Sequence, residues 1–128
     1  MHKKTLITAS ILGALAVALG AFGAHGLKQL VPPETVTTFE TGVKYQFYHV
    51  FALLIIGVVY AQVPSKALLQ AALFFQIGIL LFSGSLYALT ALKATDTVGL
   101  SGIGIITPLG GVAFIVGWLL MAKAFWKS

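Results

Sequence analysis

The chain has 128 residues, of which 59% are hydrophobic and only 9% are charged. Soluble domains carry about 25% charged residues, and a soluble core of this size cannot hide so much apolar surface. The absence of cysteine excludes disulfides, thiolate metal sites and a cysteine nucleophile. We therefore expect one integral membrane domain, residues 1–128, with the lipid bilayer as its main partner.

The first apolar run covers residues 5–24 and follows Lys3 and Lys4, which predicts a transmembrane helix. A signal peptide has a shorter apolar region of about 7–15 residues, so we expect this helix to be retained. Its small residues form two faces, one of Ala9, Gly13, Ala16, Gly20 and Gly23 and another of Ala14, Ala18 and Ala21. Small faces allow close packing in lipid, so we expect this helix to be central and to contact more than one neighbour.

The second helix has a clear start signal at Pro32-Pro33-Glu34, because proline suits the first turn and an early acid suits the helix dipole. We expect it to begin near residue 33 outside the membrane and to cross the membrane over residues 42–62. That length corresponds to about 31 Å, which matches the hydrocarbon core. The turn Val63-Pro64-Ser65-Lys66 then leads into a third helix over about residues 67–92.

The second long connection ends in an apolar, glycine-rich stretch, residues 98–106. We interpret this stretch as a loop at the membrane interface, with a lid or a shallow re-entrant segment as the alternative. Thr107-Pro108 resembles an N-cap followed by proline at the first helical position, which predicts the fourth helix over about residues 107–124. The sequence therefore predicts an all-α fold, a four-helix transmembrane bundle with antiparallel helices.

The lysines indicate the orientation of this bundle. One side holds five lysines and no acid, namely Lys3, Lys4, Lys66, Lys123 and Lys127. The other side holds three lysines and all three acids. The positive-inside rule places both termini in the cytoplasm, or in the matrix of an organelle. The lysines stand at the ends of apolar segments and form no patch, so a nucleic-acid partner is not expected.

Polar residues gather in the outer half of the predicted bundle, and this asymmetry defines the candidate site. The candidate binding residues are His25, Glu40, Lys44, Tyr45, His49, Gln76, Ser83 and Tyr87. Glu40 and Lys44 are four residues apart with the acid first, the better orientation for an ion pair. His49 lies about 10 Å below Gly42 along the helix and should face the bundle. Its expected partners are the polar stripe of the third helix: Gln76, Ser83, Tyr87 and Thr90.

Each of these residues has a structural and a functional interpretation. His49 either forms a hydrogen bond between helices or serves as a ligand or proton-handling group. For His25 we expect a capping or loop role, and for the polar stripe a role in helix contacts. The histidines and acids lack the compact spacing of a metal site, and no serine has a base at fixed spacing. We therefore expect no metal, no cofactor and no enzymatic activity.

Several segments resemble a known family and follow its order over nearly the whole chain. They are similar to the bacterial membrane proteins grouped as domain of unknown function 423, whose eukaryotic relatives resemble transmembrane protein 256. The matching segments are GAFGAHGL (20–27), FETGVKYQFYH (39–49), FSGSLY (82–87) and ITPLGG (106–111), followed by Gly117-Trp118. Lys44 stands where the family leads us to expect a basic residue, often arginine. The resemblance implies a four-helix fold in the bacterial plasma membrane and no established activity.

Two functional hypotheses follow from the sequence. The first is a non-enzymatic structural or accessory component of a membrane assembly, which packs through its small faces against itself or a larger complex. The alternative is binding or transport of a small molecule, lipid or quinone at the polar cluster. His49, Tyr45, Tyr87, Ser83 and Gln76 would then line the pocket, with the Glu40–Lys44 pair at its mouth.

Overall fold

The computed structural model describes residues 1–95 and 102–128, and all regular structure in these ranges is helical. The elements are α1 (Lys3–Ala24), η1 (Gly26–Gln29), α2 (Pro33–Val59), α3 (Lys66–Gly78), η2 (Ile79–Ser83), α4 (Gly84–Ala94) and α5 (Ile103–Trp126). They form four spans that are long and apolar enough to cross a membrane: α1 with η1, α2, the unit α3-η2-α4, and α5. The expected all-helical protein with four candidate membrane spans is confirmed.

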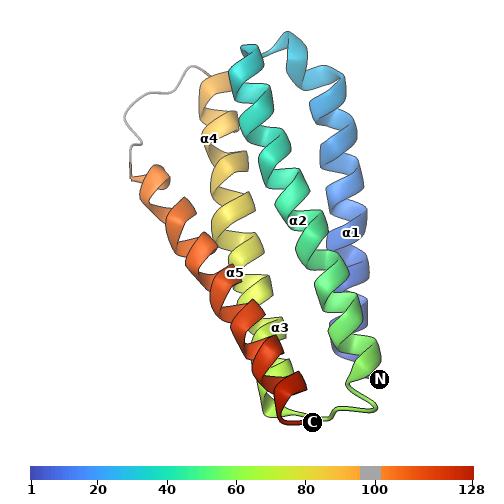
Figure 1. The fold of residues 1–128 in the computed structure, drawn as a ribbon. Coiled ribbons are helices and arrows are strands. Elements are labelled where there is room, and N and C mark those ends of the chain that lie inside the picture. The colour runs from blue at the N-terminus through green and yellow to red at the C-terminus, as the bar shows by residue number, and fades with distance from the viewer. Residues whose placement is uncertain (96–101) are drawn as a thin grey trace.

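The helices are arranged around a central pair. α2 and the unit α3-η2-α4 lie in the middle, and α1 and α5 flank this pair on opposite sides (Figure 1). α1 packs chiefly on α2, whereas α5 packs on α3, η2 and α4. Both chain ends lie at the same end of the molecule, beside the connection between α2 and α3 (Figure 1).

Only one of the two small faces of α1 packs inside the protein. A Cβ atom built on Gly13 would lie 3.5 Å from Val50, and one built on Gly20 would lie 3.5 Å from Val43, both in α2. The second face, formed by Ala14, Ala18 and Ala21, is exposed. The expectation that the first helix is central is therefore wrong. Its most apolar window is the least buried of the four spans, and that of α2 is the most buried.

The third span changes its helical geometry in the middle, because η2 is a π-helical turn. A π turn holds about one residue more than an α turn, so the residues after it are rotated by about 100° relative to a continuous α-helix. Gln76 and Ser83 are seven residues apart and would share a face in an uninterrupted helix. In the structure, Gln76 lies in a pocket with residues at the start of α1, whereas the Ser83 hydroxyl donates to the Gly42 carbonyl of α2 at 2.7 Å.

α5 begins at Ile103, so the start expected at Thr107-Pro108 is wrong and Pro108 lies inside the helix. The proline is accommodated near the beginning of α5, where the carbonyl that it cannot bond belongs to the exposed residue Gly104. The Thr107 hydroxyl pairs with the Ser85 hydroxyl and does not cap the helix. The lid or interface loop is expected over residues 98–106. Of these, residues 103–106 are helical, and residues 98–101 lie outside the described residues.

Glycines bring α5 against the third span. A Cβ atom on Gly110 would overlap the backbone of Phe82 in η2, and one on Gly117 would lie 2.6 Å from the Phe75 ring. Across the same interface, Gly78 of α3 leaves room for the Phe114 ring. Close backbone approach of this kind is how helices pack in lipid. These contacts hold α5 on α3 and η2.

Candidate functional site

A groove of about 570 Å³ lies between α2 and α5. The two helices pack on the third span more closely than on each other, which leaves this space between them. Aromatic residues dominate its lining: Tyr45, Tyr48 and His49 from α2, Phe82 from η2, and Phe114 and Trp118 from α5. Tyr48 and Trp118 are substantially exposed, so the groove opens at the outer surface of the bundle. No acid, lysine or arginine lines it.

His49 forms one wall of the groove, and both of its ring nitrogens have partners. Nδ1 lies 2.7 Å from the Tyr45 carbonyl oxygen, which can only accept, so Nδ1 carries the proton and donates. The indole Nε1–H of Trp118 donates to Nε2 at 3.0 Å. The ring also stacks on Phe114, with 3.6 Å between centroids and 8° between planes. The geometry therefore selects the neutral Nδ1–H tautomer and fixes the ring in place.

A second polar cluster, around Gln46, links three of the four spans. Gln46 is 3% exposed, and its Nε2 donates to the Leu12 carbonyl of α1 at 2.8 Å. Its Oε1 accepts from the Tyr87 hydroxyl of α4 at 2.6 Å. In a membrane interior an amide needs such partners, because no water is present to satisfy it. This cluster holds α1, α2 and α4 together.

The structure brings together only part of the predicted binding set. Tyr45 and His49 line the groove, as the alternative functional hypothesis requires. Ser83 and Tyr87 turn toward Gly42 and Gln46 on α2, away from that groove. The expected pairing of His49 with the polar stripe of the third helix is wrong. The π turn rotates that stripe, and the close contact of α5 brings Trp118 to His49 instead.

The remaining members of the predicted set lie elsewhere. Gln76 lies in a pocket with residues at the start of α1. Within residues 1–95 and 102–128, Glu40 and Lys44 form no ion pair. An exposed pair gains only tenths of a kcal/mol, about as much as ordering the two side chains costs. His25 is exposed at the C-cap of α1.

Sequence reasoning missed Gln46 and Trp118, although each carried a signal. Gln46 carries an amide near the start of a segment that is apolar enough to span a membrane, and polar groups at such a position need a partner. Trp118 lies eight residues before Trp126, about 12 Å along the helix, which is deeper than an interfacial aromatic belt. No local sequence signal predicts which helices these residues contact, namely α1 and α4 for Gln46 and α2 for Trp118.

The chemistry that the groove offers is that of a binding surface. Its lining presents aromatic rings and the Tyr45 and Tyr48 hydroxyls, which have no protein partner within the described residues. In residues 1–95 and 102–128 no three His, Cys, Asp or Glu side chains are close enough to hold a metal ion. In the same ranges, every buried side-chain nitrogen or oxygen has a hydrogen-bond partner.

Comparisons with known proteins give one family. The family described as protein of unknown function (DUF423) matches residues 19–111. The UPF0382 membrane protein YwdK of Bacillus subtilis is 39% identical over 123 residues, which cover 95% of each chain. The UPF0382 inner membrane protein YgdD of Escherichia coli is 40% identical over 118 residues, 91% of this chain and 84% of the relative. A UPF0382 membrane protein of Haemophilus influenzae is 38% identical over 128 residues, 100% of this chain and 98% of the relative. No solved structure matches the chain.

The Trp118–His49 hydrogen bond gives a testable prediction about stability. Trp118→Phe keeps an aromatic ring but removes the N–H donor and leaves His49 Nε2 without its partner. We expect a loss of about 1 kcal/mol in the free energy of unfolding. The measurement is unfolding by sodium dodecyl sulfate in mixed micelles, followed by circular dichroism.

Trp126→Phe is the matched control, because Trp126 is 90% exposed and should give almost no change. Equal losses in the two variants would mean that the hydrogen bond does not contribute to stability.

Proposed function

The chain belongs to the DUF423 family of membrane proteins, and from this membership and its groove we propose that it is a non-enzymatic protein that holds a lipophilic molecule between α2 and α5. The observation that carries the proposal is an uncharged aromatic groove beside a fixed histidine. Its volume of about 570 Å³ is in the usual range of small-molecule sites, about 300–1,000 Å³. The groove opens sideways, so a ligand can enter from the bilayer.

The lining favours a molecule with an apolar body and few polar atoms, such as a quinone or a lipid chain. Tyr45, Tyr48 and Trp118 are the exposed rings of the lining, and a flat group can stack against them. The hydroxyls of Tyr45 and Tyr48 can each donate to a carbonyl or ether oxygen. A charged ligand is disfavoured, because the groove has no opposite charge to offset the cost of removing that charge from water.

The hydrogen bonds of His49 support a non-enzymatic role. A general base needs a free lone pair within reach of its substrate. The lone pair on Nε2 accepts from Trp118, and Nδ1 donates to a backbone carbonyl. His49 therefore fits a role in fixing Trp118 and the groove wall better than a role in proton transfer.

A variant that fills the groove tests the binding proposal. Gly111 lines the groove, and a Cβ atom there has no neighbour closer than 4.0 Å, so Gly111→Leu should fold and occupy the ligand volume. We expect native mass spectrometry after gentle extraction to find a bound small apolar molecule on the wild type. In the variant this signal should fall about tenfold. The leucine side chain takes up space that the ligand needs, and forcing both into the groove costs about 1–3 kcal/mol of binding free energy.

Gly104→Leu is the matched control. Gly104 is exposed on the same helix, has no neighbour within 4 Å of a Cβ atom and lies outside the groove. It should retain the molecule. Wild-type protein that carries no small molecule, or a Gly111→Leu variant that retains it fully, would contradict the proposal.

We also propose that the spans are antiparallel in the membrane, with both termini in the cytoplasm. The positions of the lysines support this, because five lysines and no acid belong to the end with the termini. The chain lacks cysteine, so single cysteines can report the orientation. In intact bacterial cells, Gln29→Cys should react with a membrane-impermeant maleimide and Ser128→Cys should react only after lysis. The reverse pattern would overturn this orientation.

A second candidate role, as a subunit of a membrane assembly, is favoured by the exposed small face of α1. Ser10, Ala14, Ala18 and Ala21 follow the small-residue spacing of close helix contacts and are exposed. Either a second copy or another membrane protein would pack there. We expect cross-linking in the native membrane to give a defined complex.

The complex should be lost in Ala18→Leu, since the larger side chain separates the two backbones. It should persist in Ala122→Leu, the same substitution at an exposed position of α5. A wild-type chain that stays monomeric in mild detergent, without any cross-linked partner, would count against this role.

A further inference from the structure

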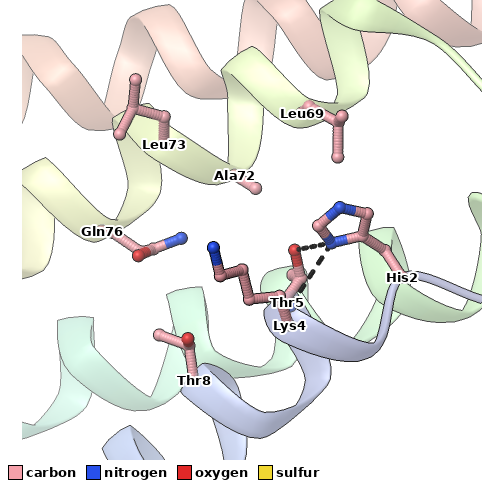
Figure 2. A pocket seen from close by; sticks show the side chains of 8 residues that line it. All are labelled: His2, Lys4, Thr5, Thr8, Leu69, Ala72, Leu73 and Gln76. Carbon is pink, nitrogen blue, oxygen red and sulfur yellow. Dashed lines mark hydrogen bonds between the residues drawn. The ribbon is translucent and has the colours of Figure 1, made fainter.

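A separate pocket of about 340 Å³ lies between α1 and α3 (Figure 2). Its lining residues lie between His2 and Thr8 and between Leu69 and Gln76. Both α1 and α3 begin at the end of the molecule that carries the termini (Figure 1). His2, Lys4, Thr5 and Thr8 line one wall, and Leu69, Ala72, Leu73 and Gln76 line the other. None of these residues lines the groove between α2 and α5, so the pocket is independent of the proposed function.

The polar groups of this pocket are mostly donors. The Lys4 side chain extends toward Gln76 across the space between the helices (Figure 2). Within the described residues, the Thr8 hydroxyl and the Gln76 amide have no protein partner. No carboxylate lines the pocket. The pocket therefore offers an ammonium, an amide and a hydroxyl, and no acid. Such a set of groups is complementary to an anion that has several acceptor oxygens.

His2 adds to this donor set through its tautomer. Its Nδ1 accepts from the Thr5 backbone N–H at 3.4 Å and lies 2.7 Å from the Thr5 hydroxyl. Because Nδ1 accepts, the proton of the neutral ring is on Nε2, which remains available as a donor. The hydroxyl of Thr5 is directed to His2 as well, so Thr5 orients the histidine (Figure 2).

The other surfaces of the pocket are apolar. Leu69, Ala72 and Leu73 belong to α3, and Leu73 is 54% exposed on the outer surface of the bundle. A head group bound among Lys4, Thr8 and Gln76 would leave an acyl chain to lie against the exposed side of Leu73. Basic pockets between transmembrane helices are established sites for anionic lipid head groups. Lysine is a common partner of phosphate, which it binds as a point charge.

We propose that this pocket binds the phosphate group of an anionic molecule, and that its apolar wall favours a phospholipid as the source. Lys4 supplies the charge, and Thr8 and Gln76 supply directed hydrogen bonds. The lysines at this end of the chain, without an acid among them, raise the local concentration of anions.

The test compares two neighbouring lysines. Lys3 and Lys4 are both exposed at the start of α1, but only Lys4 lines the pocket. Delipidated protein in detergent is titrated with phosphatidylglycerol and, separately, with phosphatidylcholine of the same chains, and bound lipid is counted by native mass spectrometry. We expect phosphatidylglycerol to bind more tightly. Lys4→Gln should weaken this binding about fivefold, and Lys3→Gln by less than about twofold.

Thr8→Val provides a second variant that changes no charge and keeps the size of the side chain. Loss of its hydroxyl should weaken phosphatidylglycerol binding about threefold. Equal losses in Lys3→Gln and Lys4→Gln, or equal binding of the two lipids, would overturn the proposal, because either result indicates attraction without a built pocket. A parallel titration adds millimolar inorganic phosphate. If inorganic phosphate displaces the lipid, the claim that the phosphate belongs to a phospholipid is wrong, and the pocket is assigned to a soluble phosphate compound. If lipid binding is undiminished, a phospholipid is supported as the source of the phosphate.

Discussion

The close approach of α5 to the third span is the constraint on which the groove depends. Gly110 has no Cβ, so the backbone of α5 rests directly on Phe82 of η2. Between helices in lipid there is little hydrophobic driving force, so contacts of this kind decide which helices touch. Because α5 is held on α3 and η2, it stands away from α2 at the level of Tyr45 and His49. The groove is the space that this packing leaves open.

Hydrogen bonds between helices then fix the faces that meet. Gln46 joins α2 to α1 and α4, His49 joins α2 to α5, and Ser83 joins η2 to α2. Each of these hydrogen bonds contributes about 1 kcal/mol, so a rotation of α2, which would break several of them at once, is opposed. His49 therefore serves as a structural link, and the proposed ligand would contact the exposed rings and the tyrosine hydroxyls of the groove. Four of the seven buried polar residues in the described ranges, Gln46, His49, Ser83 and Ser85, bond to another helix.

The membrane class and the four spans were predictable from the sequence, because about 20 consecutive apolar residues admit few other structures. The family was identified from the segments that resemble it. The partners of individual residues were not. No local signal marks the π turn at Ile79–Ser83, and that turn separates Gln76 from Ser83. The capping pattern at Thr107 was outweighed by helix formation from Ile103 onward. Gln46 was identifiable as a polar residue that needed a partner, but its bond to the Leu12 carbonyl depends on the glycine contacts of α1.

The packing order of the helices also has a consequence for how the protein is made. Among the spans that precede it in the chain, each span packs mainly on the one immediately before it: α2 on α1, the third span on α2, and α5 on the third span. A helix that leaves the ribosome therefore finds a packing partner already in the membrane, and the main contacts between spans join neighbours in the sequence. His49 is an exception, because its Trp118 partner is synthesised last. Arrival of α5 satisfies this histidine and forms the groove in the same step, so an incomplete chain would have neither.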